Sequence, residues 1–310
     1  MSPNPRADVL VIGAGLIGLA IARELHDRGL RVLILERAGA GQEASWAGAG
    51  MLAAEQTAAD SPLRPLARAS AAIYAEFCRA LEAETGCHVD YRPIGTELAI
   101  APGNGGGPSP SAGGKKDDHI LSDHCVDNRL LVSALRASVL RRAPRLQLLE
   151  NTPVTGVTPD NGAWTVSSPA GHWTAAHVLN ASGAWAAAIA GAAVPARPRK
   201  GQLLAVQGPP GLLPRTLVGE GVYLVPRSDG RIVIGATLED NGFDKTVIPA
   251  TIARLRARAE RLLPAIAGLP EIERWAGLRP GTPDDLPYLG ALGPGLWVAT
   301  GHFRDGILLT

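Results

Sequence analysis

Short apolar runs and helically spaced apolar residues alternate at the start of the chain. Residues 8–12 form a short apolar run that predicts a strand, and residues 16–27 carry apolar side chains at helical intervals. Gly29 follows this predicted helix, and a second apolar run, 31–35, ends at Glu36. Strand, helix and strand in this order predict a parallel βαβ unit.

The remainder of the chain predicts a mixture of helices and strands. Residues 62–84 predict an amphipathic helix, with Leu66, Ile73, Phe77 and Leu81 as its core positions. Other predicted helices lie at 126–142, after Trp185 and at 251–263, and further short strands at 147–150, 154–157, 178–181 and 296–300. An antiparallel sheet is predicted from 201–207, 222–226 and 231–235, with a hairpin turn at 228–230.

Composition narrows the class of partner. The chain has 310 residues, 46% of them apolar, and its 30 basic and 29 acidic side chains almost cancel. Such a balance gives no basic field for nucleic acid, and no apolar stretch is long enough to span a membrane, so the expected partners are small molecules. The N-terminal residues lack a signal-peptide pattern, and the expected location is the cytoplasm. The three Cys and seven His show no metal-ligand spacing, so no bound metal is expected.

A glycine-rich turn connects the first predicted strand to the first helix. Gly13 permits a sharp turn, Gly15 allows a pyrophosphate to approach the backbone, and Gly18 allows the helix to pack on the strand. The helix N-terminus presents partial positive charge to the phosphates, and Glu36 is placed to bind a ribose diol. The motif predicts a dinucleotide site, but it does not choose between FAD and NAD, and a structural glycine turn remains an alternative.

Several sequence blocks resemble one family. They are QEASWAGAGMLAAE at 42–55, GVYLVPR at 221–227, GAT at 235–237, GLRPGTPD at 277–284 and GHFRDGILL at 301–309. In this order and spacing they are similar to the glycine oxidase family of the FAD-dependent D-amino-acid oxidase group, of the type that serves thiamine biosynthesis. Only residues 101–125 lie outside the resemblance.

The resemblance implies FAD bound without a covalent link, because relatives that tether the flavin use a Cys near Arg279 and this chain has none there. Gly48 and Gly50 are expected to remove side chains where the planar ring approaches. Besides the three glycines of the turn, the residues implied along the cofactor are Leu16, Ile17, Glu36, Arg37, Ala44, Ser45, Ala49, Gly50, Met51, Val154, His302, Phe303, Arg304, Asp305, Gly306, Ile307 and Leu308.

For the substrate, the resemblance implies Arg279 and Arg304 beside the amino acid, with Tyr223 nearby. An arginine fork matches a carboxylate in a bidentate manner and would orient the Cα hydrogen toward the flavin. Arg279 as a surface ion-pair residue remains an alternative, and alternation along 222–225 makes Tyr223 as suitable for sheet packing as for the site. No general base is evident.

The implied architecture is α/β, with a Rossmann-like FAD-binding domain interleaved with an antiparallel-sheet substrate domain. The expected FAD-binding domain comprises residues 1–80, 120–197 and 278–310, and the substrate domain residues 81–100 and 198–277. Residues 101–119, rich in Gly, Pro and Ser, are expected to form a flexible loop. The family continues past this chain's end into a terminal helix that is missing here, so residues 307–310 are expected to fray.

The implied reaction is oxidative deamination of glycine, sarcosine or D-alanine, with hydride transfer from Cα to the flavin and oxygen as acceptor. For glycine the products would be the imine or glyoxylate, ammonia and hydrogen peroxide, with methylamine in place of ammonia for sarcosine, and the imine would serve thiazole synthesis for thiamine. Three alternatives stay open: a sarcosine oxidase or D-amino-acid dehydrogenase, an inactive or unstable flavin-binding fragment, and an NAD-linked reductase. A homo-oligomer is compatible with the sequence, which does not specify the oligomeric state.

Overall fold

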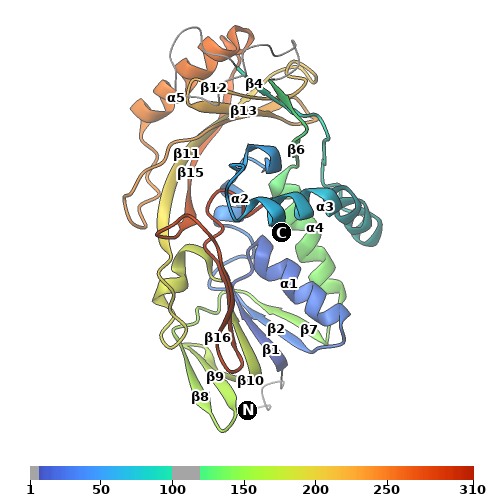
Figure 1. Cartoon of the computed structure of the whole chain (residues 1–310), viewed down its shortest axis with the longest axis vertical. Coiled ribbons are helices and arrows are strands. Elements are labelled where there is room, and N and C mark those ends of the chain that lie inside the picture. The colour runs from blue at the N-terminus through green and yellow to red at the C-terminus, as the bar shows by residue number, and fades with distance from the viewer. Residues whose placement is uncertain (1–6, 100–118) are drawn as a thin grey trace.

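The computed structural model describes residues 7–99 and 119–310, and two large sheets occupy opposite ends of its long axis (Figure 1). The predicted loop at 101–119 lies outside the described residues except for its last position. Among the described helices, none is long and apolar enough to cross a membrane. The predicted α/β class, with one mainly parallel sheet and one mainly antiparallel sheet, is confirmed.

The first sheet has the order β16-β17-β10-β1-β2-β7, with a hairpin, β8 and β9, attached to β10. The four pairings from β17 to β7 are parallel. The strands are β1 (Ala7–Ile12), β2 (Val32–Leu35), β7 (Leu146–Leu149), β8 (Gly156–Asp160), β9 (Ala163–Ser168), β10 (Gly171–Asn180), β16 (Tyr288–Gly293) and β17 (Leu296–Thr300). Helices α1 (Leu16–Asp27) and α4 (Asn128–Arg141) lie together on one side of this sheet (Figure 1). The predicted βαβ unit is therefore β1, α1 and β2.

The second sheet has the order β15-β11-β14-β13-β12-β4-β5, and all its pairings are antiparallel except that of β12 with β4. Its strands are β4 (Thr96–Leu98), β5 (Ile120–Leu121), β11 (Arg197–Gln207), β12 (Thr216–Gly219), β13 (Val222–Pro226), β14 (Arg231–Gly235) and β15 (Glu271–Gly281). Helix α5 (Pro249–Leu262) covers one face through Ile252, Leu255 and Ala259. The opposite face contacts the segment from α2 (Ala44–Ala47) to β3 (Met51–Leu52), and β3 pairs with β6 (His124–Cys125).

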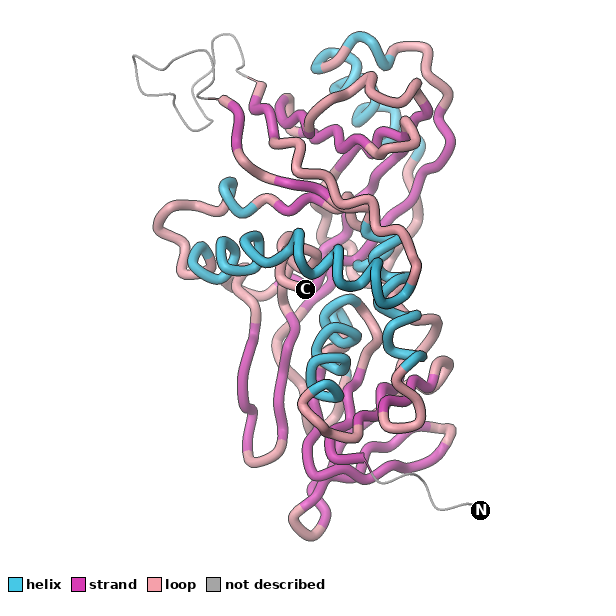
Figure 2. The backbone as a smooth tube through the Cα atoms, turned by 90° about the vertical axis from the view of Figure 1, so that its right-hand side faces the viewer, coloured by secondary structure: helices cyan, strands magenta, loops and turns pink. Residues whose placement is uncertain are grey.

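The long helix α3 (Arg64–Thr85) lies at the level between the two sheets (Figure 2). The prediction chose the wrong core positions for its first half, because Leu66 and Ile73 are 43% and 63% exposed. The buried face instead contains Tyr74 and Cys78, together with the correctly predicted Leu81. The Tyr74 hydroxyl donates to the Ile307 carbonyl, 2.8 Å away, and helical periodicity alone cannot reveal such a distant partner.

The last residues of the chain are ordered against α3, contrary to the expected fraying. Leu309 N donates to Asp305 O at 2.9 Å, which closes one helical turn, and Leu308 is 1% exposed. The Ser70 hydroxyl donates to the Leu308 carbonyl. Tertiary contacts thus replace the helical bonds that a single turn lacks.

The predicted alanine-rich helix after Trp185 is present only as a short helical segment that begins before Trp185. The segment forms a 3₁₀-helix, η2 (Gly183–Ala188). Six residues are too short a segment for alanine propensity to stabilise an α-helix.

Candidate functional site

The turn after β1 is too crowded for side chains. Gly13 has φ +104°, and a Cβ there would lie 2.6 Å from the Ala181 carbonyl oxygen. A Cβ on Gly18 would lie 2.0 Å from the Gly13 carbonyl oxygen, so α1 packs directly on the turn. The N-terminus of α1, preceded by Gly15 at the N-cap, therefore sits at the carboxyl end of β1 with no acidic residue in its first turn. This is the arrangement that binds pyrophosphate in dinucleotide sites.

Two polar side chains border that helix N-terminus. The Ser45 hydroxyl accepts from the Leu16 N–H at 2.9 Å, which shows that this N–H is directed toward an external acceptor. Glu36 is 8% exposed, and its two carboxylate oxygens accept from the N–H groups of Ala14 (2.7 Å) and Ala38 (3.0 Å). Each carboxylate oxygen keeps a further lone pair, so Glu36 can still accept from a ribose hydroxyl.

The segment 45–50, which we call the cofactor loop, is held through its carbonyl groups. Five of its carbonyl oxygens accept from donors outside the loop. The donors are Asn128 Nδ2 to Ser45 and Trp46 (2.8 and 2.9 Å), Trp275 Nε1 to Ala47 (2.9 Å), Arg227 Nη2 to Ala49 (2.9 Å) and Val126 N to Gly50 (2.8 Å). Because the carbonyls are fixed by protein donors, the loop has one defined conformation against which a flat ligand can bind.

The glycines of this loop have a packing role that was not expected. A Cβ on Gly50 would lie 1.8 Å from the Val126 carbonyl oxygen, and one on Gly48 would lie 2.6 Å from Ile307 Cδ1. Both missing side chains would point into the protein. Gly48 and Gly50 therefore allow the chain segments to pack closely, and the expectation that they also clear space for a ring stays a prediction.

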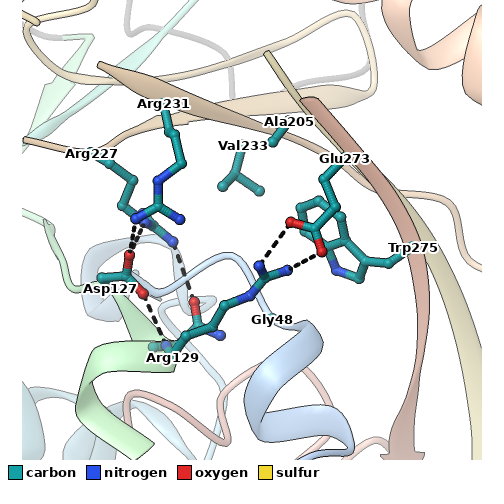
Figure 3. A pocket seen from close by; sticks show the side chains of 10 residues that line it. Gly48, Asp127, Arg129, Ala205, Arg227, Arg231, Val233, Glu273 and Trp275 are labelled. Carbon is teal, nitrogen blue, oxygen red and sulfur yellow. Dashed lines mark hydrogen bonds and ion pairs between the residues drawn. The ribbon is translucent and has the colours of Figure 1, made fainter. Parts of the chain in front are cut away.

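Behind the cofactor loop is a cavity lined by charged side chains (Figure 3). Arg227, 3% exposed, lies 3.4 Å from Asp127 and donates to Asn128 Oδ1 at 3.2 Å. Its burial lowers the pKa of this guanidinium, and the Asp127 charge opposes that change. Arg129 forms two hydrogen bonds with Glu273, at 2.8 and 3.1 Å. These ion pairs connect the second sheet to α4 and the loop.

The candidate substrate residues lie flat across the second sheet. A Cβ on Gly201 of β11 would lie 2.3 Å from Arg279 Nη1, and a Cβ on Gly235 of β14 would lie 2.7 Å from the Tyr223 hydroxyl. Since β11 and β14 are neighbours between β15 and β13, Arg279 and Tyr223 reach toward each other over two glycines. Burial raises the pKa of Tyr223, and the nearby charges of Arg279 and Arg304 act in the opposite direction.

Arg279 and Arg304 have no carboxylate partner among the residues that the structure describes. Arg279 donates to the Thr237 carbonyl at 3.2 Å, and Arg304 is exposed beside the Phe303 ring, with its Cζ 5.2 Å from the ring centroid. The alternative of Arg279 as a surface ion-pair residue therefore finds no partner acid in the described chain. Two unpaired guanidinium groups beside a tyrosine can bind a carboxylate.

The other predicted cofactor residues make contacts within the protein at several places around the glycine turn and the cofactor loop. Arg37 pairs with Glu43 and its Cζ lies 3.6 Å from the Trp185 ring centroid. His302 is 5% exposed, and burial lowers its pKa to about 4. The structure does not test their roles toward a cofactor. Ile17, Ala44, Met51, Val154, Asp305 and Gly306 likewise remain predicted cofactor residues.

Sequence reasoning missed the residues that support the site. Asn128 and Arg227 were not recognised as anchors of the cofactor loop, and Gly201 and Gly235 were not recognised as spacers. The glycines carried only a weak signal, because Gly201 and Gly235 stand at the ends of the predicted strands 201–207 and 231–235, where glycine is common. Arg227 also carried a weak signal, because it is an arginine that directly follows the apolar strand predicted at 222–226. The Ala49 carbonyl, to which Arg227 donates, is 178 positions away in the sequence.

The βαβ start, the open helix N-terminus with its buried acid, and the anchored loop define a dinucleotide-binding oxidoreductase fold. The family model described as "FAD dependent oxidoreductase" matches residues 8–104 and 110–310, and the chain belongs to this family. The donors around the site fit FAD, since the helix N-terminus suits its pyrophosphate and Glu36 its ribose.

Relatives and solved structures agree with this assignment. The glycine oxidase of Pseudomonas aeruginosa is 36% identical over 97% of this chain and 91% of its own length. The bifunctional protein ThiO/ThiG of a Synechocystis species is 38% identical, and the chain spans 50% of that longer protein. The crystal structure of glycine oxidase from Geobacillus kaustophilus matches with a TM-score of 0.88 and 31% identity, over 99% of this chain and 92% of that one.

Proposed function

We propose that this chain is an FAD-dependent oxidase of glycine or a similarly small amino acid such as sarcosine or D-alanine. The observation that carries the proposal is the pair Arg279 and Arg304, which have no carboxylate partner in the described chain and lie beside Tyr223. The similarity to glycine oxidases over nearly the whole chain supports the choice of substrate. The balanced reaction is glycine, oxygen and water giving glyoxylate, ammonia and hydrogen peroxide.

The protein's own task is to hold the substrate. Arg279 and Arg304 bind the carboxylate, and the Tyr223 hydroxyl, kept protonated by its raised pKa, donates a further hydrogen bond. A small molecule fixed at its carboxylate has its Cα hydrogen in one orientation, which supplies much of the rate enhancement. The amine must be neutral at the moment of reaction, and no side chain is assigned to remove its proton.

FAD would be held at the first sheet. The glycine turn of Gly13, Gly15 and Gly18 and the N-terminus of α1 at Leu16 and Ile17 would hold the pyrophosphate, with Ser45 accepting from the Leu16 N–H beside it, and Glu36 would bind the ribose. Residues of the cofactor loop and of segment 302–308, which pack together at Gly48 and Ile307, would border the ring. FAD held there would supply the hydride acceptor, with oxygen as the final electron acceptor.

We also propose that the FAD is released on denaturation, since each of the three cysteines is free and none is near Arg279 in sequence. Absorbance of the filtrate after denaturation and ultrafiltration measures this, and yellow colour retained with the chain would contradict it. The two sheets support the division into an FAD-binding domain of 1–80, 120–197 and 278–310 and a substrate domain of 81–100 and 198–277. The free thiols suit the reducing cytoplasm, where we place the protein.

The relatives named ThiO/ThiG support a role in supplying the imine for thiazole synthesis in thiamine formation. The nearest competing function is a sarcosine oxidase or D-amino-acid dehydrogenase of the same group. Hydrogen peroxide release with glycine, sarcosine, D-alanine and D-proline separates them. Turnover of glycine, sarcosine and D-alanine above that of D-proline supports our proposal, and preference for a bulky D-amino acid contradicts it.

A further inference from the structure

The connection between β14 and α5 reaches from the second sheet to segments of the first. Within it, the Phe243 ring stacks on the Trp185 ring of η2, with the ring centroids 5.2 Å apart and the planes inclined by 29°. Lys245 Nζ, from the same connection, lies 3.1 Å from a carboxylate oxygen of Glu43. We call these two contacts, Phe243 with Trp185 and Lys245 with Glu43, the clasp, because they join segments that follow strands of different sheets.

The part of the connection that carries Phe243 and Lys245 is fixed to the second sheet. Glu239 exchanges two backbone hydrogen bonds with Lys200 of β11, each 2.9 Å long. The Lys200 side chain is fully buried, and its ammonium lies 3.0 Å from the Asp244 carboxylate. A buried ammonium needs such a counter-charge, which holds Asp244 at β11. Phe243 and Lys245 flank Asp244, so the second sheet determines their position.

The partners of the clasp stand at the edge of the first sheet where a dinucleotide binds. Trp185 follows the carboxyl end of β10, and Glu43 follows the carboxyl end of β2 and is the N-cap of α2. Ligands of parallel α/β sheets bind at the carboxyl ends of the strands, here beside the glycine turn and Glu36. Arg37, which directly follows Glu36, connects the two partners, since it pairs with Glu43 and its Cζ lies 3.6 Å from the Trp185 ring centroid.

The contacts of the clasp are partly exposed to solvent. Phe243 is 52% exposed, and the side chains of Lys245 and Glu43 are 46% and 26% exposed. An exposed ion pair and a half-exposed aromatic pair each stabilise a closed arrangement only modestly. The clasp can therefore open without unfolding either sheet, in contrast to the buried ion pair of Lys200 with Asp244.

We propose that the clasp closes the entrance of the FAD site, so that FAD enters and leaves only while the clasp is open. The family of the chain supplies the cofactor, and the inference does not depend on which amine is oxidised. A closure of this kind acts on rates. Weakening it speeds binding and release together and leaves the dissociation constant nearly unchanged, whereas loss of a direct contact with FAD speeds release alone.

The experiment measures FAD release and FAD binding separately. Release is followed by flavin fluorescence after dilution of the holoprotein, and binding after FAD is mixed with the apoprotein of the full chain. The double variant Phe243→Ala/Lys245→Met should raise both rate constants by about tenfold and change Kd by less than about twofold, because an aromatic pair and an ion pair are lost. Lys245→Arg, which keeps the charge, should leave both rate constants unchanged.

Two matched controls alter the same kinds of side chain elsewhere. Leu289→Ala shortens an apolar side chain of β16 that is 50% exposed, and Arg261→Met removes one partner of an exposed ion pair with Glu220. Neither control should change the rate of FAD binding or release.

An unchanged rate of release in the double variant would overturn the proposal. Faster release with unchanged or slower binding would also overturn it, because the residues would then only stabilise bound FAD. If the double variant does not fold, Lys245→Glu decides in the same way, since it alters one exposed residue and places a like charge against Glu43. Both rates can be measured whether or not any amine is oxidised, so failure of the proposed substrate is distinguishable from failure of the clasp.

Discussion

Adding one methyl group at Gly201 should displace Arg279 without disturbing the fold. The backbone of Gly201 is outside the left-handed region, so alanine introduces no backbone strain there. The added Cβ would lie 2.3 Å from Arg279 Nη1 and 2.7 Å from its Cζ. Carbon and nitrogen atoms prefer separations of about 3.5 Å, so the guanidinium must move by about 1 Å.

The expected magnitude follows from that displacement. A shift of about 1 Å in a group that positions substrate can reduce the rate by about 100-fold. The loss of one charge-assisted hydrogen bond, about 1.5 to 3 kcal/mol, corresponds to a similar factor in kcat/KM. The effect should appear mainly as a raised KM for any carboxylate substrate, because Arg279 binds the ground state as well as the transition state.

The assay is steady-state oxidation of glycine and sarcosine by Gly201→Ala, together with thermal melting. Gly293→Ala is the matched control, since Gly293 lies in β16 with open space around its Cβ position and an unstrained backbone. Melting temperatures of both variants should stay near that of the unaltered protein, because the end of a flexible side chain can move. An unchanged KM in Gly201→Ala would show that Arg279 does not bind the substrate carboxylate.

Three further predictions concern charged and titratable groups. Arg304→Lys should raise KM for carboxylate substrates by about tenfold or more in steady-state assays, since a point charge cannot replace a bidentate fork; an unchanged KM would remove Arg304 from the site. Arg227→Met should lower the free energy of unfolding by about 3 to 5 kcal/mol in urea titrations, because Asp127 loses a buried partner. It should also weaken FAD binding, because the Ala49 carbonyl loses its donor. Equal stability and equal FAD affinity would refute this prediction. Burial lowers the pKa of His302 from 6.5 to about 4, so the unfolded chain binds the extra proton first as the pH falls. The neutral His302 should therefore contribute about 3 kcal/mol to the free energy of unfolding above pH 6.5, and this contribution should be lost as the pH falls from 6.5 to 4. In urea titrations at several pH values, His302→Asn should show a smaller dependence of the free energy of unfolding on pH over this range. An identical dependence in the two proteins would contradict the prediction.

The sequence predicted those parts of the fold that depend on local pattern. The βαβ unit could be read because its two strands are short continuous apolar runs and its helix has a clear period. Helix α3 shows the limit of that reasoning. Its sequence offers apolar residues on more than one face, and the buried face is the one that packs against distant segments, as in the hydrogen bond from Tyr74 to Ile307, 233 positions away.

The site was predictable to a similar extent. The glycine turn with Glu36, and the two arginines recognised by resemblance, could be proposed before the structure was known. The anchors of the cofactor loop could not, because Asn128, Trp275 and Arg227 come from three distant segments and act on backbone carbonyls, which carry no residue-specific signal.

The most direct test of the proposed function is the visible absorption spectrum of the purified protein, recorded before and after anaerobic addition of glycine and then sarcosine. The account predicts flavin absorption bands that bleach when either amine is added and return when oxygen is admitted. Flavin bands that persist with both amines, or a purified protein without flavin absorption that binds no added FAD, would contradict it.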